Sequence, residues 1–286
     1  MSRSNEGRCC DAVLSILEGG QGGAREILSM DTPQSRGVEI RCRIRGTVYA
    51  LEHTLVDPYP DKRRDDREFL GVMGELERSL SRSTGLRADG SYHLYVESHA
   101  FRGRRRPQIP LIQEGIRAWV LANAHRLEPP AIGHTQELSA GPPSVPVRVR
   151  LQFTLWPGWG GLLLTGRMAP PDLPRERRER LSAALLKKGP KLHAEHTAGA
   201  RTVLILEDDD VALSNPIEIG AALHAELAKL NYSIEEVYLV DTKLLDRWQV
   251  WRMKQGANLW PTRSENPELW EFPPAQLNDL FAVTAK

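Results

Sequence analysis

The sequence of 286 residues has only three cysteines, and two of them, Cys9 and Cys10, are adjacent. An odd number of cysteines without metal-ligand spacing argues against both a disulfide framework and a zinc module. No stretch approaches the ~18 consecutive apolar residues of a membrane-spanning helix. The opening segment, MSRSNEGRCCDAV, also lacks the apolar stretch of a signal peptide. We therefore expect a soluble, cytoplasmic protein that does not enter a membrane.

An excess of charge of one sign is also lacking, because the formal net charge is only +1. No overall electrostatic field indicates a polyanionic partner, so any nucleic-acid surface must be local. The eight histidines form no HxH or HExxH pattern, which argues against the commonest histidine-based metal motifs. With 41% hydrophobic and 26% charged residues, the composition is that of an ordinary globular protein.

The most informative segment is VEIRCRIRGTVYALEHTLV, residues 38–56, which predicts two β-strands folded back on each other. Apolar and charged residues alternate up to a turn at Arg45-Gly46-Thr47, and an apolar run then leads into Glu52. Pairing of the two strands brings Glu39, near the start of the first, towards Glu52, near the end of the second. Two carboxylates held together repel each other unless a cation or a proton lies between them. The pair is therefore a candidate Mg²⁺ site.

This arrangement resembles the PD-(D/E)xK nuclease superfamily, the restriction-endonuclease-like fold. In that superfamily an acid opens one strand and a (D/E)xK tripeptide lies on the next. Glu39 stands at the position of the first acid, and Glu52-His53-Thr54 stands at the tripeptide. The chain departs from the pattern in two ways. The first acid is Glu rather than Asp and lacks a preceding proline, and Thr54 replaces the lysine, as in divergent members.

The resemblance implies a phosphodiester hydrolase that uses Mg²⁺ or Mn²⁺. Glu39 and Glu52 would bind the metal, the backbone carbonyl of His53 would complete its shell, and a metal-bound water would attack the phosphate. In such proteins the lysine can come from a neighbouring helix, and Lys188 and Lys191 are the candidates here. A lysine at the site would orient the water and neutralise charge on the phosphate. Lysines near the end of a helix also commonly do no more than complement the helix dipole.

Two further charged clusters have two interpretations each. The acids of residues 207–210 follow a predicted buried strand, where a ligand or metal often binds in α/β sheets, but a solvated loop has the same composition. A dense group of arginines follows another predicted strand, and guanidinium groups suit phosphate oxygens. An arginine-rich surface loop without nucleic acid is equally ordinary. The candidate nucleic-acid contacts are Arg102, Arg104, Arg105 and Arg106.

Apolar periodicity and capping signals predict helices over about 11–18, from Asp65, over 110–125, over 174–188 with a stop at Gly189-Pro190, and from Asn215. Strands are predicted over 91–97, 202–206, 237–240 and 249–251, with a second hairpin formed by 147–155 and 161–168. The final third thus contains a βαβ unit. We expect one α/β domain over 1–286, with a mixed central sheet flanked by helices around a restriction-endonuclease-like core. A loop and β-hairpin insertion is expected at about 128–170.

The leading hypothesis is a metal-dependent nuclease that acts on DNA or RNA, in genome defence or DNA processing. The second hypothesis is a catalytically inactive relative that serves as a binding or regulatory module, and the third is a metal-dependent hydrolase of a small molecule. In an active nuclease the carboxylates of Glu39 and Glu52 should lie within roughly 4–6 Å of each other, so that they share one metal. The sequence does not choose between DNA and RNA, and it leaves a homo-oligomer open.

Overall fold

The structure, a computed structural model, divides the chain into two compact units. Unit 1 comprises residues 1–60 and 172–286, and unit 2 is the segment 61–171 inserted into it. The expectation of a single domain elaborated at about 128–170 is therefore corrected, because the inserted segment starts just after the first hairpin and has its own hydrophobic core. The structure describes residues 5–30, 37–81, 85–140, 142, 145–158, 161–210, 213–260 and 268–282.

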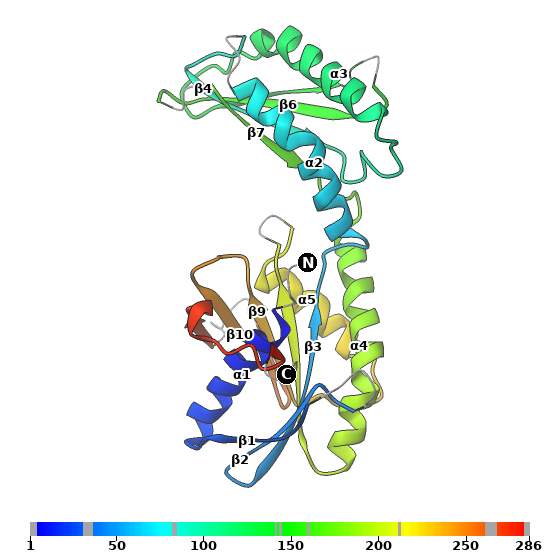
Figure 1. Cartoon of the computed structure of the whole chain (residues 1–286), viewed down its shortest axis with the longest axis vertical. Coiled ribbons are helices and arrows are strands. Elements are labelled where there is room, and N and C mark those ends of the chain that lie inside the picture. The colour runs from blue at the N-terminus through cyan, green and yellow to red at the C-terminus, as the bar shows by residue number, and fades with distance from the viewer. Residues whose placement is uncertain are drawn as a thin grey trace. The chain divides into compact units, whose positions relative to one another are not determined.

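Unit 1 is a mixed β-sheet with helices on both faces (Figure 1), which confirms the predicted α/β class. Its strands follow the order β1-β2-β3-β8-β9-β10-β11, and β12 also pairs with β10. The elements are α1 (Glu6–Gln21), β1 (Arg25–Met30), β2 (Ile40–Ile44), β3 (Thr47–Leu55), α4 (Leu173–Thr197), β8 (Arg201–Asp208), α5 (Pro216–Leu227), β9 (Glu236–Asp241), β10 (Trp248–Gln255), β11 (Asn258–Leu259), β12 (Leu269–Phe272) and a 3₁₀ turn (Pro274–Gln276).

Strands β2 and β3 form the predicted antiparallel hairpin, with Ile40 opposite Leu51 at its open end. The two turn residues have positive φ, 46° at Arg45 and 83° at Gly46, which gives the turn the twist that suits a two-residue hairpin. Strand β3 then pairs in parallel with β8, which contains the predicted strand at 202–206. The predicted βαβ unit is also confirmed, because β8 and β9 are parallel and α5 connects them.

Side chains of β3 alternate between two cores. Tyr49 and Leu51 pack in the core that α1 covers, whereas Ala50 packs in the core that α4 and α5 cover. Because successive side chains of a strand point to opposite faces of the sheet, Glu52 faces α4 and His53 faces α1. Adjacent residues of the hairpin thus place a carboxylate on one face of the sheet and an imidazole on the other.

Helix α4 does not stop at Gly189-Pro190, contrary to the prediction, and continues to Thr197. A proline inside a helix removes one backbone hydrogen bond and normally bends or ends it. Packing holds α4 together here, because Leu192 beyond the proline is fully buried in the core. Gly189 leaves room for Tyr232, whose hydroxyl donates a hydrogen bond to the Leu185 carbonyl at 3.0 Å. The continuation matters for function because Lys188 and Lys191 end up on one helix.

Unit 2 is a four-stranded sheet in the order β5-β6-β4-β7, with a core shared by two helices. The predicted hairpin of 147–155 and 161–168 is wrong, because β4 lies between β6 and β7, antiparallel to the first and parallel to the second. Strand β5 falls in a predicted loop, since its residues are mostly polar and exposed. The elements are α2 (Lys62–Ser81), β4 (Gly90–Val96), α3 (Gln108–Asn123), a 3₁₀ turn (Ala124–Arg126), β5 (Thr135–Ala140), β6 (Val149–Leu155) and β7 (Leu162–Arg167).

In neither unit is any helix of the described residues long and apolar enough to cross a membrane.

Candidate functional site

Glu39 and Glu52 meet at the open end of the hairpin. Ile40 and Leu51 are the last paired residues of β2 and β3, and Glu39 comes just before them in the chain. Beyond that pair, the Glu39 carboxylate takes the place of a partner strand and accepts a hydrogen bond from the backbone N–H of His53. The end of β2 therefore fixes one carboxylate beside the backbone of the tripeptide that carries the other.

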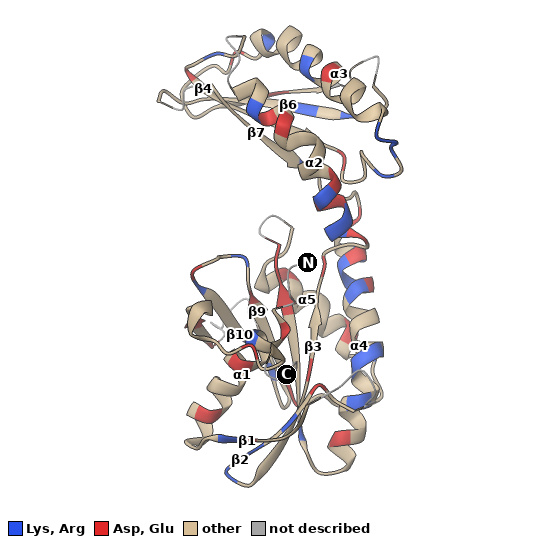
Figure 2. Ribbon diagram, in the orientation of Figure 1, with Lys and Arg blue, Asp and Glu red and all other residues tan. Residues whose placement is uncertain are grey.

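Two lysines of α4 reach this pair, and basic positions recur along that helix (Figure 2). The Lys188 ammonium contacts Glu39 Oε1 and lies 2.6 Å from Glu52 Oε2. The Lys191 ammonium lies 3.1 Å from Glu52 Oε1 and donates to the Gly37 carbonyl at 2.8 Å. Residues three apart share one face of a helix, which is why both lysines reach the same carboxylate. Sequence reasoning selected all four of these side chains, and the structure brings them together.

The two carboxylates are close enough to share one cation. Each has an oxygen within contact of the same Lys188 nitrogen. Those oxygens are thus no more than about 6 Å apart, twice a hydrogen-bond length. In the described part of the chain, the Glu52 oxygens contact no hydrogen-bond donor other than the two ammonium groups. A positive charge is therefore what holds this carboxylate in place.

Burial sets the protonation of the cluster. Glu52 is 0% exposed, and Glu39 and Lys188 are each 8% exposed. Burial raises the pKa of Glu39 to about 7; the neighbouring Lys188 opposes this rise and the Glu52 charge adds to it. For Lys188, burial alone would lower the pKa, but hydrogen bonds to both carboxylates outweigh it and the pKa is raised. Lys188 is thus a fixed positive charge, whereas Glu39 changes protonation near neutral pH.

His53 lies on the opposite face of β3 from Glu52, and its imidazole belongs to a second buried group. Its Nε2 lies 3.1 Å from Glu207 Oε2 at the carboxyl end of β8. Asn5 and Thr242 donate to the other Glu207 oxygen at 2.9 and 3.1 Å. Burial would raise the pKa of Glu207, but these hydrogen bonds, that of His53 first, leave it lowered. The residue was proposed to act through its backbone carbonyl, and sequence reasoning missed this role of its side chain.

On the His53 side of β3, two groups of described side chains have donor atoms close enough to hold a cation, and neither group includes Glu52. Ligand atoms of Glu6, Glu39 and His53 all lie within 4.8 Å of one another, and a second such group joins His53 to Cys9 and Glu207. Carboxylate oxygens are the donors that Mg²⁺ and Mn²⁺ prefer. Glu6 was missed because the first helix was predicted to begin at Asp11, one turn too late. An acid in the first turn of a helix is otherwise explained by the helix dipole.

Thr54 lies two residues after Glu52, so it shares the α4 face of β3 and is half-buried. Its hydroxyl carries no charge. The positive charge that a lysine would supply at this position comes instead from Lys188 and Lys191, which approach Glu52 from the helix.

The acids of residues 207–210 are not a solvated loop, since Glu207, Asp208 and Asp210 are buried. Asp208 pairs with Lys243, which also pairs with Asp241, at 3.1 and 2.9 Å. Burial raises the pKa of Asp208 to about 6 even though Lys243 opposes the rise. Glu207 contacts His53, the middle residue of the predicted tripeptide.

The predicted phosphate-binding arginines belong to unit 2, and two of them have partners inside that unit. Arg102 forks onto the buried Asp65, with contacts of 2.7 and 2.9 Å. Arg104 donates to the Pro146 carbonyl at 3.1 Å. Arg105 and Arg106 are exposed. Of the four arginines, Arg105 and Arg106 are thus the two whose side chains are exposed to solvent and accessible to a phosphate.

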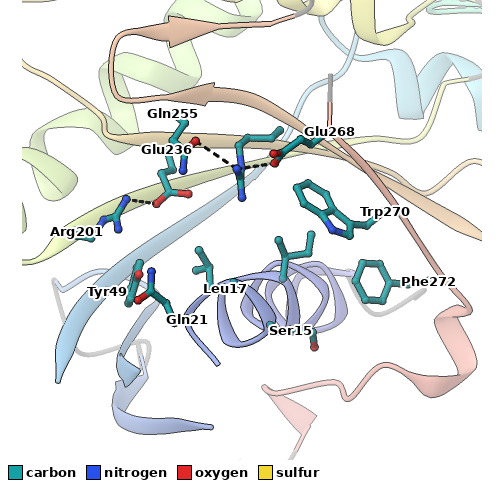
Figure 3. A pocket seen from close by; sticks show the side chains of 14 residues that line it. Ser15, Leu17, Gln21, Tyr49, Arg201, Glu236, Gln255, Glu268, Trp270 and Phe272 are labelled. Carbon is teal, nitrogen blue, oxygen red and sulfur yellow. Dashed lines mark hydrogen bonds and ion pairs between the residues drawn. The ribbon is translucent and has the colours of Figure 1, made fainter. Parts of the chain in front are cut away.

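A cavity of about 570 Å³ lies on the α1 face of the unit 1 sheet, away from the acid–lysine cluster (Figure 3). Its walls include Tyr49, Arg201 and Glu236 from the starts of β3, β8 and β9, whereas Glu52 and Glu207 lie near the other ends of β3 and β8. The charged groups pair within the wall, Arg201 with Glu236 at 2.7 Å and Arg252 with Glu268 at 2.5 Å. The cavity is therefore not lined by the predicted catalytic residues Glu39, Glu52, Lys188 and Lys191.

Comparison with known proteins gives no match: no family model fits the chain, and no curated protein or solved structure is significantly similar to it. The case for a function therefore rests on the geometry of the site.

Proposed function

We propose that unit 1 is a metal-dependent phosphodiester hydrolase with a restriction-endonuclease-like core, and that its active site contains Glu39, Glu52 and Lys188. The observation that carries the proposal is the contact of one buried ammonium with both carboxylates. Three residues distant in the sequence and chosen for a shared chemistry converge at one point. The local topology supports the same proposal, because the first acid precedes one strand, the second lies on the next, and the lysine comes from the adjacent helix.

The chain's own residues account for substrate activation. In hydrolysis the oxygen of water bonds to phosphorus, the bridging P–O bond breaks, and the leaving oxygen takes up a proton. The Lys188 ammonium, held by two carboxylates, is a fixed donor for a phosphate oxygen on which charge develops. Burial raises the pKa of Glu39 to about 7 in the absence of an ion, and a bound cation would favour its charged form, so Glu39 would serve as a ligand rather than as the base. Lys191, which is partly exposed, adds positive charge on the solvent side.

The residues that would hold Mg²⁺ or Mn²⁺ are Glu39 and Glu52, to which the resemblance adds the His53 backbone carbonyl, and a ligand atom of Glu6 lies within 4.8 Å of one of Glu39. Their oxygen donors suit these ions. When bound, the ion would polarise a phosphate oxygen and neutralise its charge. Glu39 and Glu52 would then exchange part of their contact with Lys188 for contact with the ion.

A catalytically inactive binding module is the second candidate, and one observation favours it. Two lysines balance two glutamates in the cluster, so the four side chains are neutral as a set without any ion. A cluster of this kind can simply hold α4 against β3. The two candidates differ in their response to metal: an active site gains stability from Mg²⁺ or Mn²⁺, and a self-sufficient ion-pair cluster does not.

The test is a cleavage assay of the full chain on plasmid, single-stranded DNA and RNA, with Mg²⁺, Mn²⁺ or EDTA. We expect cleavage of at least one substrate with metal and none in EDTA. Lys188→Gln should lower the rate by about 10²-fold or more, the typical cost of losing a donor to developing charge. Lys187→Gln is the matched control, because Lys187 is the exposed neighbour on the same helix. Equal rates for the two variants would remove Lys188 from the mechanism.

A further inference from the structure

We propose that the open face of the unit 2 sheet binds single-stranded nucleic acid, with Tyr95 and Arg150 at its centre. The inference goes beyond the hydrolase proposal, because it concerns a different unit and requires no cleavage.

The sheet of unit 2 has two unlike faces. On β4, Tyr92, Leu94 and Val96 are fully buried in the core that α2 and α3 share. The side chains that alternate with them, Ser91, His93 and Tyr95, point to the other face. None of those three belongs to a hydrophobic cluster of the described residues.

The strand register assembles this open face into rows. Arg150 of β6 lies opposite Tyr95 on one side, and Gly166 of β7 lies opposite it on the other. In the next row, His93 lies between Gln152 and Leu164. The edge strand β5 extends the rows with small or polar residues, which are Thr135, Glu137 and Ser139.

Aromatic rings lie at the centre of the face. The His93 and Tyr95 rings are stacked, with centroids 6.2 Å apart and planes 14° apart. The Arg150 guanidinium lies 5.0 Å from the centre of the Tyr95 ring. Gly166 permits this arrangement, because a Cβ there would come 3.0 Å from the Tyr95 ring. Half-buried rings on a sheet are the platform on which proteins stack unpaired bases.

The charge of the unit complements a polyanion. Residues 61–171 contain sixteen lysines and arginines and eleven aspartates and glutamates, a formal net charge of +5, while the rest of the chain carries −4. Arg150 forms no salt bridge among the described residues, and its guanidinium packs over the Tyr95 ring. Within the rows around it, Glu137 is the one acid, and it accepts a hydrogen bond from Gln152 at 2.9 Å.

These observations favour a single strand over a duplex. A duplex hides the faces of its bases, whereas a single strand offers them for stacking, and Arg150 lies beside the ring to contact the backbone phosphates. Stacking accepts every base, so we expect weak sequence preference. In the sequence, unit 2 is inserted between β3, which carries Glu52, and α4, which carries Lys188. The chain that binds the nucleic acid through unit 2 is therefore the chain that carries the candidate active site.

The test is fluorescence anisotropy with the full chain in EDTA, where no metal-dependent cleavage occurs. The probes are labelled 20-nucleotide oligo-dT, oligo-rU and a 20-base-pair duplex. We expect either single strand to bind at least tenfold more tightly than the duplex. Tyr95→Leu should weaken single-strand binding about tenfold or more, the usual effect of losing one stacking ring, and Tyr95→Phe should stay within threefold. Arg150→Gln should weaken binding and reduce the slope of log K against log salt by about 0.7.

Arg117→Gln is the matched control, since it removes one charge from an exposed position on α3, which packs on the other face. We expect less than a twofold change. Duplex binding as tight as single-strand binding, or Tyr95→Leu and Arg150→Gln variants that bind like the control, would overturn the proposal. Thermal melting identifies any variant that fails to fold, and Arg150→Gln then decides alone. If the chain binds a single strand but does not cleave it in Mg²⁺, the hydrolase proposal fails and the binding proposal stands. If Tyr95→Leu and Arg150→Gln both bind and cleave like wild type, the binding proposal fails and the hydrolase proposal stands.

Discussion

Replacement of Lys188 with Met tests whether a cation is what holds the two carboxylates together. Met keeps the unbranched side chain but removes the ammonium that contacts both Glu39 and Glu52. Loss of one partner from a buried ion pair costs about 3–5 kcal/mol. Lys191 still contacts Glu52 at 3.1 Å, and Glu39 can take up a proton, so we expect the lower end of that range, about 3 kcal/mol at pH 8.

A loss of this size lowers the melting temperature of unit 1 by about 6–12 °C, since 1 kcal/mol corresponds to about 2–4 °C for a unit of that length. The difference in stability between wild type and Lys188→Met should be smaller at pH 5.5, where Glu39 is protonated. A divalent ion should restore part of the loss by taking the place of the ammonium. An ion at ten times its dissociation constant contributes about 1.4 kcal/mol.

The assay is thermal and urea denaturation of wild type, Lys188→Met and Lys187→Met, each in EDTA and in Mg²⁺ or Mn²⁺. The gain from the ion should be larger in Lys188→Met than in wild type, because in wild type the ion competes with the Lys188 ammonium for the two carboxylates. The reasoning is refuted if Lys188→Met is as stable as Lys187→Met, or if the ions leave Lys188→Met unchanged.

Two further outcomes follow from the buried charges. Because the folded pKa of Glu39 is raised to about 7 from its usual 4.5, the folded state binds more protons between these values, and wild type loses stability relative to Glu39→Gln as the pH rises from about 4.5 to 7. Urea midpoints at pH 5, 6, 7 and 8 measure this, and parallel curves for the two proteins would contradict it. Arg102→Ala should destabilise unit 2 by about 1–3 kcal/mol, because the buried Asp65 carboxylate then loses the guanidinium that pairs with it. The double variant in which Arg105 and Arg106 are both replaced with Gln should change the stability by less than about 0.5 kcal/mol. Equal melting temperatures for Arg102→Ala and this double variant would show that Arg102 has no structural role.

The site was predictable from the sequence to the extent that it is local. The hairpin follows from alternation and from the turn at Arg45-Gly46, and its register alone places Glu39 near Glu52. The choice of Lys188 and Lys191 came from the resemblance, which allows the lysine to come from a helix. The contact of Glu207 with His53 was not predictable, because it depends on the register of β3 against β8, two strands that are separated in the sequence by the whole inserted unit.

The errors in the fold have the same origin. Gly189-Pro190 is a stop signal in isolation, but Leu192 beyond the proline is buried in the core, and its burial offsets part of the cost of the proline. Strands β6 and β7 are adjacent in the sequence and separated in space by β4, which comes earlier in the chain. Arg41 and Arg43 of the same hairpin pair with Glu195 and Glu26, whereas the cations that contact Glu52 come from α4. Tertiary context decides each case.

The central claim is that Glu39 and Glu52 hold a divalent ion that serves phosphodiester cleavage. The most direct test measures Mn²⁺ binding by electron paramagnetic resonance and cleavage of a labelled oligonucleotide on the same preparation, as functions of Mn²⁺ concentration. The account predicts one ion per chain, half-saturation of binding and cleavage at the same concentration, and loss of both in Glu52→Gln. Cleavage that persists in EDTA, or Glu52→Gln that binds Mn²⁺ like wild type, would contradict it.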